Sequence, residues 1–355
     1  MTPTMIILLL PISFLYHIVL SIRHKLYDWH ILKSTGFELP MICVGNLNLG
    51  GTGKTPMVEY LINLLNDSYK IATLSRGYGR KTKGFQRADL QSTYETIGDE
   101  PLQYFHKFPD IQVTVDDNRV DGVAHLLREQ GVEPPDVILL DDAFQHRRIK
   151  AGLNILLTEY QRLYCDDFLF PVGTLRDIKS AARHADIIVV SKSPKGLNQN
   201  EKQRMIQKLK PEAHQKVFFS YIEHEPLKPL NEAAKQFSVE VADAVLAFCG
   251  IANPKHFVEE LKSRYKTIDF LQFDDHHPYT EEDLVSITKR FENLCGEKKI
   301  IVTTEKDAAR LTNSPYLCQF ERVPLYDLPV AVRFHEEVKF NEEILTYVRQ
   351  NSHHC

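Results

Sequence analysis

The stretch MICVGNLNLGGTGKTPMVEY, residues 41–60, decides the fold of this chain. An apolar run over residues 41–44 leads into a glycine-rich turn, which ends in Gly53-Lys54-Thr55 ahead of an amphipathic segment. This order of strand, loop and helix is that of a phosphate-binding P-loop. In such a loop, backbone N–H groups and the positive end of the helix hold a polyphosphate.

The loop supplies the residues that we expect to contact a nucleotide: Asn48, Leu49, Gly50, Gly51, Thr52, Gly53, Lys54 and Thr55. Lys54 is expected to reach the terminal phosphates, and the Thr55 hydroxyl to ligate Mg²⁺. The strict pattern has glycine where this chain has Asn48. Asparagine tolerates left-handed backbone better than most residues, so we expect the loop to form. An ordinary glycine-rich turn is the alternative, and the flanking strand and helix disfavour it.

Composition restricts the class of protein. The chain has 355 residues, which is enough for two domains, and its net charge of −4 gives no reason to expect nucleic acid as a partner. Its six cysteines are scattered without a C-x-x-C pair, which argues against a zinc site and a disulfide framework and suits a reducing compartment. Nothing in the sequence indicates an obligate protein partner.

Residues 5–22 are apolar and lead into Arg23, His24 and Lys25. A cleaved signal peptide needs a basic region before the apolar run, and none is present. The remaining alternatives are a helix in the membrane interface, a spanning helix and a buried core helix. Pro11 and the borderline length weaken the spanning helix, so an interfacial helix with cations at the headgroups is the preferred interpretation. The remainder of the chain would then be cytoplasmic.

Two polar segments follow the P-loop helix. Residues 75–80, SRGYGR, lie after an expected strand, where ligands of open α/β sheets bind. Arg76 and Arg80 there could hold an anionic group, or the loop could be a solvated basic turn. Residues 97–101, IGDEP, place Asp99 in the first turn of an expected helix. Asp99 could be a functional carboxylate, or it could only stabilise the positive end of the helix dipole.

Candidate metal ligands follow the next buried strand. Residues 136–142, DVILLDD, end in Asp141 and Asp142, which is the shape of a Walker B element that binds the Mg²⁺ of a nucleotide. His146 in the following loop and Asp177 further on are also candidate ligands, and Arg176 is a candidate cation for the transferred phosphate. The strand over 187–190 ends in SKSP and not in the [NT]-K-x-D sequence that reads guanine, which favours ATP.

The second half reads as another α/β unit. We expect a membrane-associated helix over residues 1–25, a P-loop domain over 26–215, a linker over 216–240 and a second domain over 241–355. The loop DDHHPYT, residues 274–280, contains His276. A metal site, a carboxylate–histidine pair for proton transfer and a polar turn all remain open for this loop.

Together these motifs resemble one family, the tetraacyldisaccharide 4′-kinases (lipid A 4′-kinases) of Gram-negative bacteria. The likeness covers most of the chain and is carried by the following motifs: Pro11-x-Ser13-x-Leu15-Tyr16, Val44-Gly-Asn-x-x-x-Gly-Gly-Thr-Gly-Lys-Thr-Pro56, Ser75-Arg-Gly-Tyr-Gly-Arg80, Gly98-Asp-Glu-Pro101, Asp141-Asp-x-Phe-Gln-His146, Gly173-x-Leu-Arg176, Phe248-x-Gly-Ile-x-Asn-Pro254, Asp275-His276 and Thr304-Glu-Lys-Asp307.

The resemblance implies two α/β/α units around a cleft, the first of P-loop NTPase type, and an N-terminal helix on the cytoplasmic face of the bacterial inner membrane. It also implies transfer of the γ-phosphate of MgATP to the 4′-hydroxyl of an acylated disaccharide 1-phosphate, which forms lipid IVA in lipid A biosynthesis. Asp99 would be the catalytic base and His276 its assistant. The chain departs from the family where its usual Glu is Asp177 and where Ala143 replaces a Gly.

These residues predict in-line phosphoryl transfer, with Lys54, Arg176 and Mg²⁺ neutralising charge and Asp99 accepting the sugar proton. We expect the domains to close to bring His276 to the site. One rival is a membrane-associated nucleotide switch or partitioning-type ATPase, which would turn over ATP without a lipid acceptor. Another is a cytosolic P-loop kinase or ligase for a soluble metabolite, which the apolar N-terminus disfavours.

Overall fold

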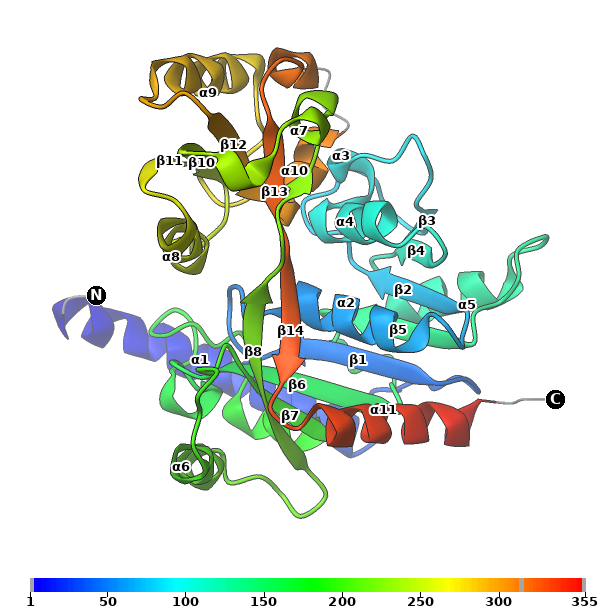
Figure 1. Ribbon diagram of the computed structural model, residues 1–355. Coiled ribbons are helices and arrows are strands. Elements are labelled where there is room, and N and C mark those ends of the chain that lie inside the picture. The colour runs from blue at the N-terminus through cyan, green and yellow to red at the C-terminus, as the bar shows by residue number, and fades with distance from the viewer. Residues whose placement is uncertain (1–2, 313–315, 353–355) are drawn as a thin grey trace.

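The computed structural model describes residues 3–312 and 316–352, so the last three residues of the expected second domain lie outside it. The described chain builds two α/β units, each with helices on both faces of a mainly parallel sheet (Figure 1). This architecture confirms the predicted fold class. Parallel strands that are covered on both faces read as continuous apolar runs, and the P-loop strand and the strand over 137–141 are buried at every position.

The larger sheet has nine strands within the described residues. In spatial order they are β14 (Val330–Phe334), β8 (Lys216–His224), β7 (Ile187–Ser191), β6 (Leu153–Glu159), β1 (Met41–Asn46), β5 (Val137–Asp141), β2 (Ile71–Ser75), β4 (Gln112–Val115) and β3 (Gln86–Arg87). Only the two edge strands run antiparallel to their neighbours. The P-loop strand β1 is therefore central, and β5 pairs with it in parallel register, Val44 opposite Asp141.

The smaller sheet has five strands among the described residues, in the order β11 (Thr267–Gln272), β10 (Ala244–Cys249), β12 (Lys299–Thr304), β13 (Leu325–Leu328) and β9 (Lys228–Pro229). The α-helices within the described residues are α1 (Pro3–Asp28), α2 (Lys54–Leu65), α3 (Tyr94–Ile97), α4 (Asp99–Lys107), α5 (Arg119–Arg128), α6 (Gln199–Leu209), α7 (Glu232–Gln236), α8 (Lys255–Arg264), α9 (Glu281–Asn293), α10 (Glu305–Thr312) and α11 (Glu337–Asn351).

Each face of the large sheet has its own core. Helices α2, α4 and α11 pack on one face, around Leu61, Tyr104 and Ile344. Helices α1, α5 and α6 pack on the other, where Leu20 and Leu126 join the core. The smaller sheet is covered in the same way by α9 and α10 on one face and by α7 and α8 on the other. Helix α1 thus lies on the face opposite to α11.

The chain crosses between the units twice, and this corrects the expected boundaries. Residues 216–224 of the expected linker form β8, and the chain returns from β13 to the large sheet as β14 and α11 (Figure 1). Residues 325–332 read by themselves as one strand, but Pro329 divides them into β13 and β14, because proline has no N–H for a sheet and constrains the residue before it. The second unit is therefore an insertion between β8 and β14.

An ion-paired triad helps to hold the two units together. Lys107 Nζ lies 2.8 Å from Glu59 Oε2 and 2.6 Å from Glu305 Oε1. Glu59 belongs to the P-loop helix and Glu305 opens α10 of the second unit. Burial would lower the pKa of Lys107, but the two carboxylates outweigh it and raise that pKa. A movement of one unit against the other must therefore stretch or break an ion pair of this half-buried lysine.

Candidate active site

The P-loop takes the conformation that its glycines allow. Lys54 is the first residue of α2, and Gly53 before it has φ +88°. Gly50 has φ +106°. Side chains rarely adopt such left-handed backbone, so glycine is required at both positions. The loop therefore leads from β1 directly to the N-terminus of α2, where backbone N–H groups are available for an anion.

Asn48 has a different role from the expected one. Its backbone is not left-handed, and its side chain is buried. The amide Nδ2 donates to Asp167 Oδ2 at 2.9 Å, while the backbone N–H of Leu49 donates to the carbonyl of Thr174 at 2.7 Å. Asn48 thus ties the P-loop to the loop between β6 and β7, a function that glycine could not supply.

Asp142 gathers the cations at the mouth of the P-loop. It follows the tip of β5, with φ +49°. Arg176 forms a bidentate ion pair with its carboxylate, and Lys54 Nζ lies 3.8 Å from Asp142 Oδ2. Arg176 also donates to Asn46 Oδ1 at 2.6 Å. Lys54 and Arg176, predicted from separate motifs, are therefore brought to one carboxylate beside the P-loop.

The pKa values of the two neighbouring acids, Asp141 and Asp142, are shifted in opposite directions. Burial, and then the charge of Asp142, raise the pKa of Asp141 to about 7. Burial would also raise the pKa of Asp142, but the hydrogen bond from Arg176 and the charge of Lys54 outweigh it and lower that pKa. Tyr104 donates to Asp141 Oδ2 at 3.1 Å, while the buried Oδ1 has no partner. A bound cation would favour the ionised form of Asp141.

Asp99 and His276 meet although they come from different units. Asp99 is the first residue of α4, after Gly98 with φ +92°. His276 Nδ1 lies 2.6 Å from Asp99 Oδ2. The His276 backbone is also left-handed, with φ +60°, and its N–H donates to the carbonyl of Gly250. The structure therefore places these two side chains in direct contact, while closure of the units stays a prediction.

Arg310 is a member of this cluster that sequence reasoning missed. Its Nη2 lies 2.6 Å from Asp99 Oδ2, and its Nη1 lies 2.8 Å from Asp307 Oδ1. Burial would raise the pKa of Asp99, but the hydrogen bonds from His276 and Arg310 outweigh it and lower that pKa to about 2. The one available signal was the spacing of Arg310, one helical turn after Asp307 of the Thr304-Glu-Lys-Asp307 motif.

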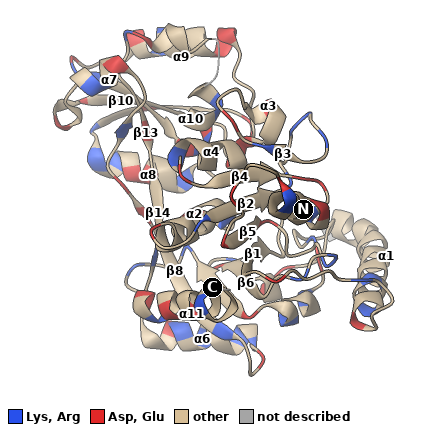
Figure 2. Ribbon diagram, turned by 90° about the vertical axis from the view of Figure 1, so that its right-hand side faces the viewer, with Lys and Arg blue, Asp and Glu red and all other residues tan. Residues whose placement is uncertain are grey.

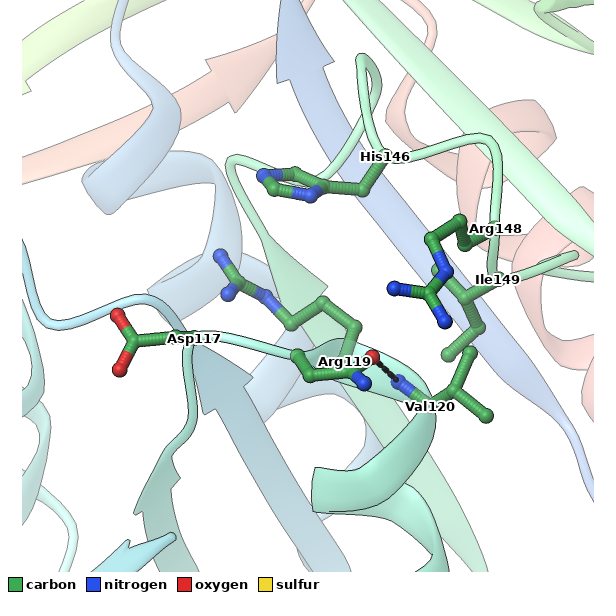
Figure 3. A pocket seen from close by; sticks show the side chains of 7 residues that line it. Asp117, Arg119, Val120, His146, Arg148 and Ile149 are labelled. Carbon is green, nitrogen blue, oxygen red and sulfur yellow. Dashed lines mark hydrogen bonds between the residues drawn. The ribbon is translucent and has the colours of Figure 1, made fainter. Parts of the chain in front are cut away.

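A second cationic site lies at the ends of β4 and β5. The loop before α5 and the loop after β5 enclose a cavity of about 140 Å³ (Figure 3). Arg119, Arg148 and His146 line it, with Asp117 at one side. Arg119 is buried, and its Nε and Nη2 have no hydrogen-bond partner. Its Nη1 donates to the carbonyl of Asp116 at 2.6 Å. Two unpaired donors on one buried guanidinium suit an anionic ligand with several oxygens.

The expected substrate arginines lie beside this cavity in unequal settings. The Arg80 side chain is 3% exposed, and its Nη2 lies 2.9 Å from Asp117 Oδ2. The Arg76 side chain is 65% exposed, and its Nε lies 3.8 Å from Asp117 Oδ1. Asp117 therefore joins the two loops. Arg119 and Arg148 were not predicted, since the sequence showed Arg119 only as the start of a helix.

Two expected metal ligands lie in unsuitable surroundings. Burial, and then the charges of Arg119 and Arg76, lower the pKa of His146 to about 4, and these arginines would repel a divalent cation. Asp177 is fully buried against α1, where its Oδ1 lies 2.7 Å from His24 Nε2. Its Oδ2 is buried without a hydrogen-bond partner. The roles of His146 and Asp177 as metal ligands therefore stay predictions.

The remaining ligands fit one Mg²⁺ only with help from a nucleotide. No group of three or more His, Cys, Asp and Glu side chains within residues 3–312 and 316–352 lies close enough to hold a metal ion. Magnesium in such sites is bound by one or two carboxylates together with substrate phosphates and water. Asp141 and Asp142 at the end of β5, with Thr55 in the first turn of α2, match that donor set.

The fold and the site define a class of protein. The site combines a P-loop, two adjacent acids and a carboxylate–histidine pair formed by residues of both units. This combination is typical of a phosphotransferase that uses a nucleotide. The family model described as LpxK, tetraacyldisaccharide-1-P 4′-kinase, matches residues 5–349. The chain belongs to this family, which confirms the resemblance found in the sequence motifs.

Curated relatives agree with the family match. The tetraacyldisaccharide 4′-kinase of Flavobacterium johnsoniae is 46% identical, over 97% of this chain and 97% of its own. That of Bacteroides thetaiotaomicron is 43% identical, over 97% of this chain and 93% of its own. A solved structure of LpxK from Aquifex aeolicus in complex with ATP has a TM-score of 0.73 and 29% identity, covering 97% of this chain and 99% of that one.

Proposed function

We propose that this chain transfers the γ-phosphate of ATP to the 4′-hydroxyl of a tetraacylated disaccharide 1-phosphate, with Asp99 accepting the hydroxyl proton. Family membership, and relatives of nearly equal length that carry this activity in their names, support the reaction. A solved relative in complex with ATP supports the donor. The chain is thus a kinase of lipid A biosynthesis, as the sequence motifs predicted.

The observation that carries the assignment of residues is the 2.6 Å contact between Asp99 Oδ2 and His276 Nδ1. A nucleotide switch has no need for a proton-accepting pair assembled from two units. A kinase for a sugar hydroxyl does need one, since the proton must leave the attacking oxygen as the phosphate bond forms. Lys306 Nζ lies 3.2 Å from His276 Nε2. Both ring nitrogens of His276 therefore have a partner, which fixes the orientation of the ring toward Asp99.

The P-loop residues have the complementary task. Backbone N–H groups at the start of α2 and the Lys54 ammonium hold the β- and γ-phosphates, and Arg176 offsets charge on the transferred group. Asp142 is ion-paired with both Lys54 and Arg176. The phosphates of a nucleotide must therefore compete with Asp142 for these two cations. Bound Mg²⁺, held by Thr55, Asp141 and Asp142, would neutralise phosphate charge and orient the γ-phosphate for in-line attack.

Arg310 determines when Asp99 can act. A carboxylate with a pKa of about 2 is ionised at neutral pH and is a weak proton acceptor. The acceptor hydroxyl must also reach an oxygen that His276 and Arg310 now engage. We propose that Arg310 moves away as the acceptor enters, which raises the pKa of Asp99 and makes it a stronger base.

The arginine cavity fits the anionic end of the acceptor. Its volume of about 140 Å³ accommodates a phosphate group, and the unpaired Nε and Nη2 atoms of Arg119 supply two donors. Arg148 and exposed Arg76 add charge nearby. We propose that the 1-phosphate of the disaccharide binds in this cavity, with Arg119 and Arg76 as its cationic contacts. The sequence predicted this role for Arg76 and Arg80.

Helix α1 supports membrane attachment. Its residues Thr4–Asp28 contain an 18-residue window with a mean hydropathy of 2.4, and only 6% of that window is buried, so a core helix does not describe it. Its first buried residue is Ser13. Ten residues precede Ser13 in the helix, roughly 15 Å at 1.5 Å per residue, which is about half the hydrocarbon thickness. We propose shallow insertion from the cytoplasmic face.

Acceptor dependence tests this function. Purified protein in detergent should turn over ATP rapidly only when the acylated disaccharide is added, and chelation of divalent cations should abolish that turnover until Mg²⁺ is restored. The matched control is the deacylated disaccharide 1-phosphate, which has the same hydroxyl without the lipid chains. Equal ATP turnover with and without the acylated acceptor would favour the nucleotide switch instead.

A further inference from the structure

The connection between β6 and β7 carries two exposed phenylalanines that the reaction does not use. Phe168 is 63% exposed and Phe170 is 51% exposed, although Leu169 between them is buried in the core. Leu169 therefore anchors the segment, while its neighbours project from the surface. Two large exposed aromatic rings on one short loop form an apolar patch, and such patches are typical of sites that bind a protein, a ligand or a membrane.

This loop lies against the apolar part of α1. Ser13 Oγ donates to the carbonyl of Leu169 at 3.0 Å, and Tyr16 donates to the carbonyl of Arg176 at 2.9 Å. Next to Ser13 on the helix, Phe14 is 65% exposed. Figure 2 shows α1 with almost no charged residues along most of its length. The phenylalanine loop therefore extends the uncharged surface of α1.

We propose that Phe168 and Phe170 enter the lipid bilayer beside α1, so that this loop is a second membrane contact of the chain. The proposal rests on the proposed function, in which the acceptor is a membrane lipid. A bilayer is favoured as the occupant because the loop continues the surface of an exposed helix that is apolar enough to cross a membrane. Lys179, whose Nζ lies 5.5 Å from the Phe168 ring centroid, supplies a cation for the headgroups.

The same loop is bonded to the nucleotide site. Asp167 precedes Phe168 and accepts hydrogen bonds from Asn48 Nδ2 at 2.9 Å and from Thr174 Oγ1 at 2.6 Å. Arg176 at the end of the loop pairs with Asp142. Insertion of the phenylalanines would thus hold the edge of the P-loop near the bilayer surface, where the hydroxyl of a lipid acceptor arrives.

A tryptophan probe tests insertion directly. The chain has one tryptophan, Trp29, so F168W is made in a W29F background. We expect its fluorescence to shift to the blue and to lose most of its intensity when vesicles of phosphatidylethanolamine and phosphatidylglycerol with brominated acyl chains are added. The control is V338W in the same background, on α11 at the opposite face, where Val338 is 71% exposed; its emission should stay unquenched.

A second variant measures the contribution to binding. F168S/F170S should partition into the same vesicles at least roughly tenfold more weakly, since a fully buried phenylalanine side chain corresponds to that ratio or more. Its turnover in detergent should stay near that of the parent, because both side chains are exposed.

Unquenched F168W emission in membrane-bound protein would overturn the proposal, as would an emission shift that follows protein concentration instead of lipid. Quenched F168W in a protein that transfers no phosphate in detergent would count against the proposed function alone.

Discussion

Replacement of Asp99 by asparagine separates the proton acceptor from the phosphate site. The pKa of Asp99 lies near 2, against the usual 3.8, and each pKa unit corresponds to about 1.36 kcal/mol, so the folded state favours the carboxylate by ~2.5 kcal/mol. The asparagine side chain is neutral at every pH, so D99N loses this stabilisation and the base together. We expect turnover to fall by roughly 10²–10⁴-fold, while ATP affinity stays near that of the parent.

The assay has a kinetic and a thermal part. Phosphate transfer and nucleotide binding are measured on the same preparation, and D110N, at an exposed acid just beyond α4, is the matched control. The lowered pKa means that Asp99 stabilises the fold above about pH 3.8 and that this contribution is lost as pH falls toward 2. The thermal deficit of D99N should therefore be constant between pH 5 and pH 8. Wild-type turnover in D99N, or loss of ATP binding, would refute the role of Asp99 as base.

Three further perturbations separate the remaining parts of the site. K54M should lose ATP binding and turnover together, because Lys54 is the P-loop cation; wild-type nucleotide affinity in a titration would contradict the assignment. R119A should raise KM for the disaccharide 1-phosphate by roughly ten- to a hundredfold, in line with ~1.5–3 kcal/mol for a hydrogen bond to a charged group, without affecting an acceptor that lacks the 1-phosphate. H24A should lower the melting temperature, because it removes a buried hydrogen bond of the Asp177 carboxylate, a loss of about 1–3 kcal/mol, and an unchanged melting temperature would show that His24 does not support Asp177.

The local motifs were predictable because each is a short pattern with its own physical cause. The glycines of the P-loop, the apolar strand before Asp141 and the acid at the start of α4 all follow from neighbours in the sequence. The reason for Asn48 did not follow, since its partner Asp167 is 119 residues away. From the local sequence, Asn48 was explained by its tolerance of left-handed backbone. In the structure, the hydrogen bond of its side chain to Asp167 explains it instead.

Contacts between distant segments account for the other differences. Arg310 lies 211 residues from Asp99, and no periodicity links them. Asp177 was predicted as a metal ligand, and the packing of α1 also gives it His24 as a partner, which the sequence did not indicate. The return of the chain as β14 was hidden because residues 325–332 read as one strand, although Pro329 lies within them. Such features depend on which elements pack together, which local patterns do not contain.

The position of the transferred phosphate tests the central claim most directly. The reaction of ATP with the acylated disaccharide 1-phosphate is followed by ³¹P NMR of the lipid product. The account predicts one new phosphate monoester on the 4′-oxygen, formed by the parent and by D110N and missing with D99N. A diphosphate at the 1-position, or free phosphate with the lipid unchanged, would contradict a hydroxyl acceptor and with it the role given to Asp99 and His276.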